Sequence, residues 1–362
     1  MVADAVAPAG EPDGLADVAV AELAAGLGAV AVHERTGRMK DGHAATKGRK
    51  STCRADFVKA RPGRLISARI LSHSAALGTG EYASMRTLVT IAALLASAAQ
   101  ALAATLDRVR ERGAFTIAYR VDAKPYSYLN ERGEPAGYIV DLCREVALAV
   151  RQSVGSEVRI SYVAVTAGDR FDAVRDGSAD ILCDPSTVTL ARRELVDFSI
   201  PTYLDGAGVI SRDAKPIERF EDLQGKRVGV LAGTTTEQVL HSSLADLKVG
   251  ATVTTVRDHR EGINLLAADQ IDAYFGDRAI LTAFLTQQTL PGFRIARHYF
   301  SLETYALALP RNDSAFRLLV DGTLARLYRS GGIRALLTKT FGRSKPDEVL
   351  DTLFVIHSLP EK

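Results

Sequence analysis

The sequence lacks an excess of charge of either sign, long apolar runs and the cysteine content of a disulfide scaffold. Its 362 residues include 45 Lys and Arg against 43 Asp and Glu, a formal net charge of +2. So small a net charge creates no strong overall field that would attract nucleic acid. No apolar run reaches the roughly 18 uninterrupted residues of a membrane-spanning helix, which argues against a multi-span membrane protein. Three cysteines are too few for a disulfide-stapled fold.

Signatures of catalysis and metal binding are also missing. The chain contains no G-x-S-x-G, H-E-x-x-H or G-x-x-x-x-G-K-[ST] motif. After residue 103, the histidines are dispersed and have no metal-ligand spacing: His241, His259, His298 and His357. We therefore expect no catalytic residue, no metal and no cofactor, and predict that the protein is not an enzyme.

The composition changes abruptly at Met85. Residues 1–84 are rich in Ala, Gly and scattered charge and show no sustained periodicity, so we predict a disordered or non-native extension. Residues 85–103 then combine a short positive start, the apolar run from Leu88 to Ala96, and Ala101-Leu-Ala103. This order is typical of a secretory signal peptide cleaved after Ala103, the alternative being a buried Ala-rich helix. Since a signal peptide lies at an N-terminus, we expect translation to start at Met85.

Cleavage after Ala103 would leave 259 of the 362 residues, with 33 Lys and Arg against 34 Asp and Glu. It would also remove Cys53 and leave Cys143 and Cys183. In an oxidising compartment these two form one disulfide, or they remain two free buried thiols, since cysteine packs well as a small hydrophobe. No cysteine stands at the cleavage site, which favours a free periplasmic protein over a lipid-anchored one.

From Ala104 onward, segments of strand and helix character alternate, which predicts an α/β fold with largely parallel sheets. A weak internal repeat, residues 171–182 and 263–274, reads twice as helix, turn, Asp and buried strand, and indicates two lobes of similar build. The expected strands are 115–119, 158–165, 179–183, 227–231, 251–256, 272–275 and 304–309, and the expected helices are 138–154, 170–175, 236–247, 262–268, 314–328 and 333–340.

Polar residues follow three of these strands, where parallel sheets bind ligands. Gly233-Thr234-Thr235-Thr236 opens a helix and suits a carboxylate, although a simple Thr N-cap explains it equally well. The segment Ser186–Arg193 offers hydroxyls and the guanidinium of Arg192, the alternative being solvated surface arginines. Asp277 suits an ammonium group or caps the next helix. A carboxylate site and an ammonium site on separate lobes would together define an α-amino acid.

Five collinear segments resemble the polar amino-acid-binding proteins of bacterial ABC transporters, from about Arg110 to Gly342. They are Lys124-Pro-Tyr-Ser-Tyr128, Gly137-Tyr-Ile-Val-Asp-Leu142, Asp180 to Ser199, Asp222 to Val230, and Gly233-Thr-Thr-Thr-Glu237. Within that family the chain is most similar to the glutamate/aspartate-binding branch. The resemblance implies a type II periplasmic-binding-protein fold, in which two lobes with mixed or parallel sheets close over the ligand by a hinge of two crossovers.

The resemblance also implies roles for individual residues. Thr187, Arg192 and, from the second lobe, Thr235 beside Thr234 would hold the α-carboxylate, and Asp277 the α-ammonium. Arg120, Arg170 and His259 would meet the side-chain carboxylate, so that three arginines and a histidine match a dicarboxylate. The alternative is that the last three are salt-bridged surface residues or, for His259, a helix start. The branch further suggests that Cys143 and Cys183 pair.

The chain departs from the family pattern at two adjacent positions. Pro185 replaces a small residue with a useful donor, and Asp184 replaces a glycine and brings negative charge near the site. Both changes put strict glutamate/aspartate specificity in question more than amino-acid binding.

We therefore expect a monomeric periplasmic protein that delivers an amino acid to an inner-membrane ABC permease. Lobe one would comprise residues 104–209 and 305–362, and lobe two residues 211–304. The alternatives are an enzyme of the cyclohexadienyl dehydratase kind on the same scaffold, or a partner that presents its ligand to a membrane receptor.

Overall fold

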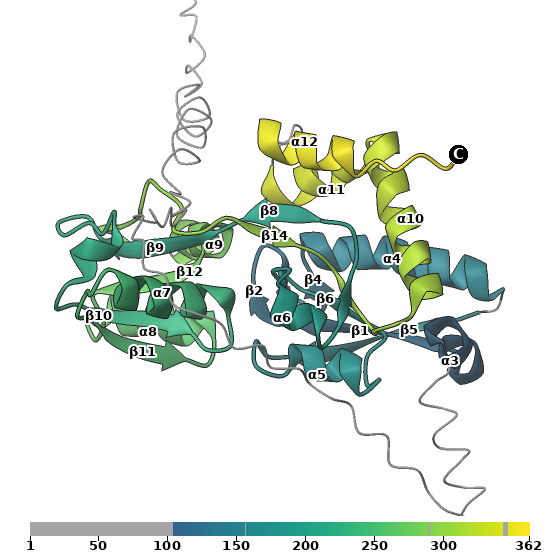
Figure 1. Cartoon of the computed structure of the whole chain (residues 1–362), viewed down its shortest axis with the longest axis horizontal. Coiled ribbons are helices and arrows are strands. Elements are labelled where there is room, and N and C mark those ends of the chain that lie inside the picture. The colour runs from purple at the N-terminus through teal and green to yellow at the C-terminus, as the bar shows by residue number, and fades with distance from the viewer. Residues whose placement is uncertain (1–103, 156, 289, 343–346) are drawn as a thin grey trace, which may run out of the picture. The chain divides into compact units, whose positions relative to one another are not determined.

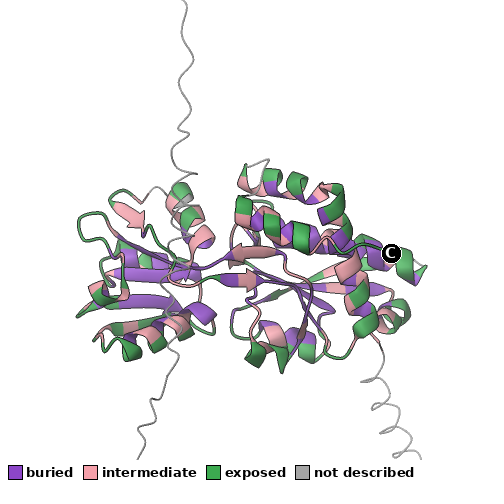
Figure 2. Cartoon of the chain, turned by 45° about the horizontal axis from the view of Figure 1, so that its top comes forward, coloured by how far each residue is buried: buried purple, intermediate pink, exposed green. Residues whose placement is uncertain are grey.

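The computed structural model describes residues 104–155, 157–288, 290–342 and 347–362. The expected extension 1–84 and signal peptide 85–103 lie outside these ranges. Of the helices described, none combines the length and apolarity needed to cross a membrane. Strand interiors are mostly buried, and exposed residues gather on the outer faces of the helices (Figure 2).

The first sheet has the strand order β5-β1-β6-β15-β7. β1 (Ala114–Arg120) runs parallel to β5 (Arg159–Val165) and to β6 (Ile181–Cys183). β15 (Ala308–Leu309) returns antiparallel between β6 and β7 (Asp197–Phe198). The sheet is therefore mixed, with three parallel strands and two shorter strands at one edge.

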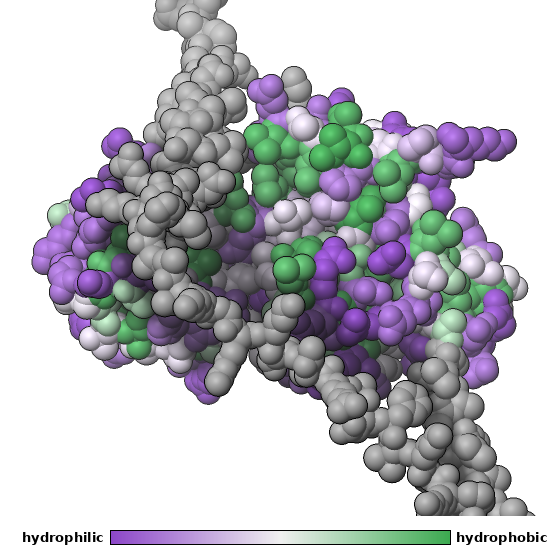
Figure 3. All heavy atoms as spheres, viewed as in Figure 1, coloured by the Kyte–Doolittle hydropathy of each residue, from purple (hydrophilic) through white to green (hydrophobic). Residues whose placement is uncertain are grey.

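Alternating side chains of β1 divide between the two faces of this sheet. Phe115 and Ile117 belong to one buried cluster with residues of five helices: α3 (Thr105–Arg112), α4 (Tyr138–Val154), α10 (Ser314–Ser330), α11 (Gly332–Phe341) and α12 (Glu348–Ile356). Ala118 instead packs toward α5 (Arg170–Arg175) on the opposite face (Figure 1). In the space-filling view, apolar residues gather over α11 and α12, where Val355 and Ile356 are exposed (Figure 3).

The second sheet has the order β11-β10-β12-β9-β13. β10 (Arg227–Leu231) runs parallel to β11 (Thr252–Val256) and β12 (Ala273–Asp277). β9 (Ala207–Arg212) is antiparallel to both of its neighbours, β12 and β13 (Phe293–Ile295). One face packs on α7 (Thr235–Asp246), and the other on α8 (His259–Ala267) and α9 (Arg278–Gln288). Both sheets thus place helices on both of their faces.

Two crossing strands connect the sheets. β8 (Tyr203–Asp205) and β14 (Glu303–Tyr305) pair antiparallel in a two-stranded ribbon (Figure 1). Glycine is required beside this ribbon, because a Cβ on Gly206 would lie 1.9 Å from the carbonyl oxygen of Ser301. β9 already pairs with β12 from Ala207, so the expected boundary at residues 209–211 falls inside a strand of the second sheet. We place that crossover at residues 203–206.

Several other elements differ from the sequence-based prediction. The single strand expected over residues 304–309 is two short strands, β14 and β15, which belong to different sheets. The helix expected from Gly262 begins at His259, because Asp258 caps it by accepting a hydrogen bond from the backbone N–H of Glu261. Short elements without apolar periodicity were not predicted: β2 (Asp122–Ala123), β3 (Ser127–Leu129), β4 (Pro135–Ala136), α6 (Leu190–Arg193) and the 3₁₀ helix Phe220–Leu223.

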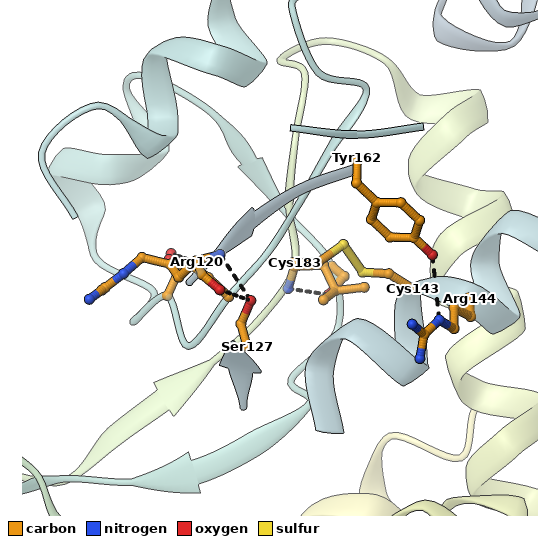
Figure 4. The surroundings of a disulfide bond; sticks show 10 residues. Arg120, Ser127, Cys143, Arg144, Tyr162 and Cys183 are labelled. Atoms are coloured by element: carbon orange, nitrogen blue, oxygen red, sulfur yellow. Dashed lines mark hydrogen bonds between the residues drawn. A yellow bond between two sulfur atoms is a disulfide. The ribbon is translucent and has the colours of Figure 1, made fainter. Parts of the chain in front are cut away.

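Cys143 and Cys183 form a disulfide, as expected (Figure 4). It joins the buried face of α4 to the last residue of β6. Nearby, the backbone N–H of Arg120 donates to Ser127 Oγ at 2.9 Å, and the Arg120 side chain extends away from the disulfide. The disulfide therefore anchors the strand end from which the loop at Asp184–Thr187 starts.

We expect the double variant Cys143→Ala/Cys183→Ala to lose about 2–4 kcal/mol of unfolding free energy. The crosslink closes a loop of 40 residues and restricts the unfolded chain. Urea unfolding of the oxidised protein, the reduced protein and the variant measures the loss. Reduced wild type should match the variant, and equal midpoints for all three would contradict a stabilising disulfide.

Candidate functional site

A cavity lies where the carboxyl ends of parallel strands from both sheets meet, as expected for ligand sites in such folds. It holds about 360 Å³ of empty space, part of it open to solvent. Every residue assigned to the ligand from the sequence lines it: Arg120, Arg170, Thr187, Arg192, Thr234, Thr235, His259 and Asp277. Pro185, Leu231, Thr236, Phe275 and Gly276 complete the lining.

Arg192 is positioned by the short helix α6. Thr189 caps this helix by accepting from the backbone N–H of Arg192, and Arg192 Nη1 donates to the carbonyl oxygen of Thr187 at 2.8 Å. The guanidinium also lies 5.2 Å from the ring centroid of Phe171. The neighbouring Arg193 is exposed and does not line the cavity. Of the two adjacent arginines, only Arg192 therefore faces the site.

The N-terminus of α7 supplies the threonines of the second sheet. Thr234 Oγ1 accepts from the backbone N–H of Glu237 and donates to the carbonyl oxygen of Leu231, so this hydroxyl serves as the helix cap. Gly233 has a φ of +75°, and a Cβ there would lie 3.3 Å from the carbonyl oxygen of Ala167. The hydroxyl of the next residue, Thr235, instead reaches toward the first sheet and lies 3.1 Å from Thr187 Oγ1.

Glu303 was not predicted from the sequence and lies at the centre of these contacts. Its Oε2 accepts hydrogen bonds from Thr187 Oγ1 and, at 2.6 Å, from Thr235 Oγ1, and its Oε1 accepts from Ser301 Oγ at 2.8 Å. The residue is buried at the start of the crossing strand β14. No motif marks it, because a single Glu before an apolar strand looks like an ordinary surface residue.

Asp277, the last residue of β12, forms the acidic side of the cavity. Burial, and then the carboxylates of Glu303 and Asp205, raise its pKa to about 8. Burial likewise raises the pKa of Asp205 to about 6, although Tyr126 donates a hydrogen bond to it at 2.8 Å. Three neighbouring carboxylates repel one another in a site of this kind, so an ammonium group placed among them would be strongly stabilised.

The two arginines assigned to the ligand side chain already have acidic partners. Arg120 Nε donates to Asp122 Oδ1 at 2.8 Å, and Arg120 Nη2 lies 2.7 Å from the same oxygen. Arg170 Nε lies 3.3 Å from Asp184 Oδ2, and the Arg170 guanidinium stacks on Phe171. Burial lowers the pKa of Arg170 to about 10 while Asp184 opposes the shift, so the side chain stays charged at neutral pH.

His259 does not act as the positive charge that the sequence-based charge matching assumed. Complete burial lowers its pKa to about 4, so the imidazole is neutral at neutral pH. Its Nδ1 lies 3.0 Å from Tyr274 Oη, within hydrogen-bond distance. His259 can therefore orient a ligand by a hydrogen bond but adds no charge.

Three contacts join the two sides of the cavity. They are the Thr187–Thr235–Glu303 cluster, the bond from Arg170 Nη2 to the carbonyl oxygen of Gly233 at 3.4 Å, and the bond from the backbone N–H of His259 to Asp122 Oδ2 at 3.3 Å. No described residues form a group of three or more His, Cys, Asp or Glu that could hold a metal. Arginines and an aspartate line the same cavity, so it can pair with ligand groups of either charge.

Comparison with known proteins identifies the class. A model of the bacterial extracellular solute-binding proteins of family 3 matches residues 115–343. The chain belongs to this family. It has the two-lobed, type II periplasmic-binding-protein fold of mixed sheets with flanking helices, so its two sheets mark two lobes.

Individual relatives agree with this assignment. The L-glutamate/L-aspartate-binding protein of Pseudomonas aeruginosa is 32% identical over 276 residues, which cover 75% of this chain and 91% of that protein. The glutamate/aspartate import solute-binding protein of Salmonella typhimurium is 27% identical over 258 residues, covering 71% and 85%. The structure of the solute receptor for L-cysteine of Neisseria gonorrhoeae matches with a TM-score of 0.61 and 25% identity, covering 68% of this chain and 99% of that one.

We expect a ligand with an ammonium group to displace about one proton from Asp277 when it binds at pH 7. Because the carboxyl has a pKa of about 8, it is mostly protonated in the free protein and must ionise to pair with the ammonium. Affinity should therefore weaken as the pH falls below 8. Calorimetric titrations in phosphate and in Tris, which differ in ionisation enthalpy, count the protons released.

Asp277→Asn serves as the control. A carboxyl whose pKa is raised in the folded state stabilises the protein only below its unfolded value of about 4 and loses that contribution as the pH rises to about 8. The amide introduced by Asp277→Asn does not ionise and has no such loss, so without ligand the variant should be more resistant to urea at pH 8 than the wild type. The same variant should no longer bind the ligand, because it cannot pair with the ammonium group. Identical heats in the two buffers would contradict the assignment of Asp277.

Proposed function

We propose that the protein captures an acidic or related polar amino acid, glutamate or aspartate first of all, and delivers it to the permease of an ABC importer. The observation that carries this proposal is the cavity in which Arg120, Arg170 and Arg192 face Asp277 across two sheets. The names of the relatives in Pseudomonas aeruginosa and Salmonella typhimurium support the same ligand class and an import role.

The charges around the cavity support a division of roles. Arg192 would anchor the α-carboxylate, with Thr187 and Thr235 beside it, and Asp277 would pair with the α-ammonium. Because both threonine hydroxyls lie within hydrogen-bond distance of Glu303, the guanidinium of Arg192 would be the principal anchor. The ligand side chain would then extend toward the remaining lining residues: Arg120, Arg170 and His259.

To deliver its ligand, the protein must be exported from the cytoplasm and its two lobes must open. We propose that residues 85–103 direct the chain to the periplasm and are cleaved after Ala103, and that the folded part acts as a monomer. The ribbon β8–β14 would form the hinge, since it connects the two sheets and its Glu303 accepts hydrogen bonds from two lining residues of the cavity, Thr187 and Thr235. The names of the relatives favour transport over the enzyme considered above.

We expect Arg192→Ala to abolish detectable binding of every amino acid that the wild type binds. Truncation leaves the α-carboxylate without its charged partner, at a cost of roughly 2–5 kcal/mol. Calorimetric titration of wild type and variant with glutamate, aspartate, glutamine and asparagine measures the effect.

Arg193→Ala is the matched control, because Arg193 is the adjacent arginine of the same helix but lies outside the cavity. It should bind like the wild type. If both variants keep wild-type affinity, the α-carboxylate is not held by Arg192 and the proposed site is wrong.

A further inference from the structure

The two arginines that line the side-chain end of the cavity are each paired with an aspartate of the chain itself. Arg120 and Asp122 are two residues apart at the end of β1 and the start of β2, and their charged atoms lie 2.7 Å apart. Arg170 from α5 and Asp184 after β6 are brought together by the fold, at 3.3 Å. The arginines are 4% and 3% exposed, so water screens these charges little.

The aspartates lie behind the arginines rather than in the cavity wall. Arg120 and Arg170 line the cavity, whereas Asp122 and Asp184 are absent from its lining. Further contacts hold both carboxylates in place: Asp122 Oδ2 accepts from the backbone N–H of His259, and Asp184 Oδ1 accepts from Ser186 Oγ. A bound ligand would therefore meet the guanidinium groups while the aspartates stay in place.

This pairing changes which side chain the cavity favours. A ligand carboxylate is attracted by each guanidinium but repelled by the aspartate a few ångströms behind it, so much of the Coulomb attraction cancels. A ligand amide carries no net charge and is not repelled, and its carbonyl oxygen still accepts from guanidinium N–H groups. The neutral His259 adds no charge that would restore the preference for an acid.

We propose that Asp122 and Asp184 determine the side-chain selectivity of this cavity by neutralising Arg120 and Arg170, so that it accepts the amides glutamine and asparagine as well as the acids. The inference rests on the proposed function, because it assumes that an amino acid occupies the cavity. It assigns a broad class of ligand, polar amino acids with a four- or five-carbon skeleton, to a site whose arginines alone would indicate acids.

The test is the ratio of dissociation constants for glutamine and glutamate, measured by calorimetry on the purified protein. We expect the wild-type ratio to lie within about tenfold, equivalent to about 1.4 kcal/mol. Asp184→Asn and Asp122→Asn keep the side-chain shape but remove the negative charge. Each should shift the ratio about tenfold toward glutamate, because a freed guanidinium attracts the ligand carboxylate without opposition.

Asp172→Asn is the matched control, because Asp172 also pairs with an arginine, Arg175, but on the exposed face of α5. It should leave the ratio unchanged. A purely structural role for Asp184 would weaken both ligands in parallel without moving the ratio. Should Asp184→Asn fail to fold, the less buried Asp122 carries the same test.

Two results would overturn the inference, and they are distinguishable. A wild-type preference for glutamate of more than tenfold, or an unmoved ratio in both Asp→Asn variants, contradicts the role of the aspartates while leaving amino-acid binding intact. Failure of the wild type to bind any of the four amino acids overturns the proposed function, and the inference with it.

Discussion

The organisation of the site depends on the burial of ionised groups between two sheets. A buried charge is tolerated only when it is paired and hydrogen-bonded, because its removal from water costs several kcal/mol. Arg120 meets this requirement through Asp122, which also accepts a hydrogen bond from Arg120 Nε. Arg170 is paired with Asp184, while its Nε donates a hydrogen bond to Ser186 Oγ. Each of the two arginine–aspartate pairs is thus nearly neutral as a unit. Burial, and then repulsion from Glu303 and Asp205, raise the pKa of Asp277 to about 8, so its carboxyl is mostly protonated at neutral pH.

Glu303 connects the ligand cavity to the strands that join the two lobes. Glu303 belongs to the crossing strand β14, and its carboxylate accepts from Thr187 of the first lobe and Thr235 of the second. A change in the angle between the sheets must therefore alter the hydrogen bonds beside the cavity. Gly206 lets the first crossing segment pass close to Ser301 at the start of the second, so the ribbon holds Glu303 beside the cavity lining.

Much of this arrangement was predictable from the sequence because the residues follow buried strands. Arg192 follows β6 of the first sheet, whereas Thr235 and Asp277 lie at the carboxyl ends of β10 and β12 of the second. Polar residues at the carboxyl ends of parallel strands point to a ligand. The sequence indicated that Asp184 brings negative charge near the site, but not that it pairs with Arg170, and it did not mark Asp122 or Glu303. Their significance depends on distances set by tertiary folding, as between Asp184 and Arg170.

The fold shows the same division between local and distant information. The long helix α4, with its regular apolar spacing, matches the sequence-based prediction residue for residue, and α7 and α10 match it to within two residues at each end. The segment 304–309 does not, because two short strands that share one apolar run join different sheets. The charge of His259 was also mistaken, since only the folded environment shows that its ring is wholly buried beside Tyr274.

A crystal structure of the protein grown with L-glutamate tests the central claim most directly. The account predicts one amino acid in the cavity, with its α-carboxylate on the guanidinium of Arg192, its ammonium on Asp277, and its side chain toward Arg120 and Arg170. A ligand bound elsewhere, or one whose α-carboxylate lies away from Arg192, would contradict it.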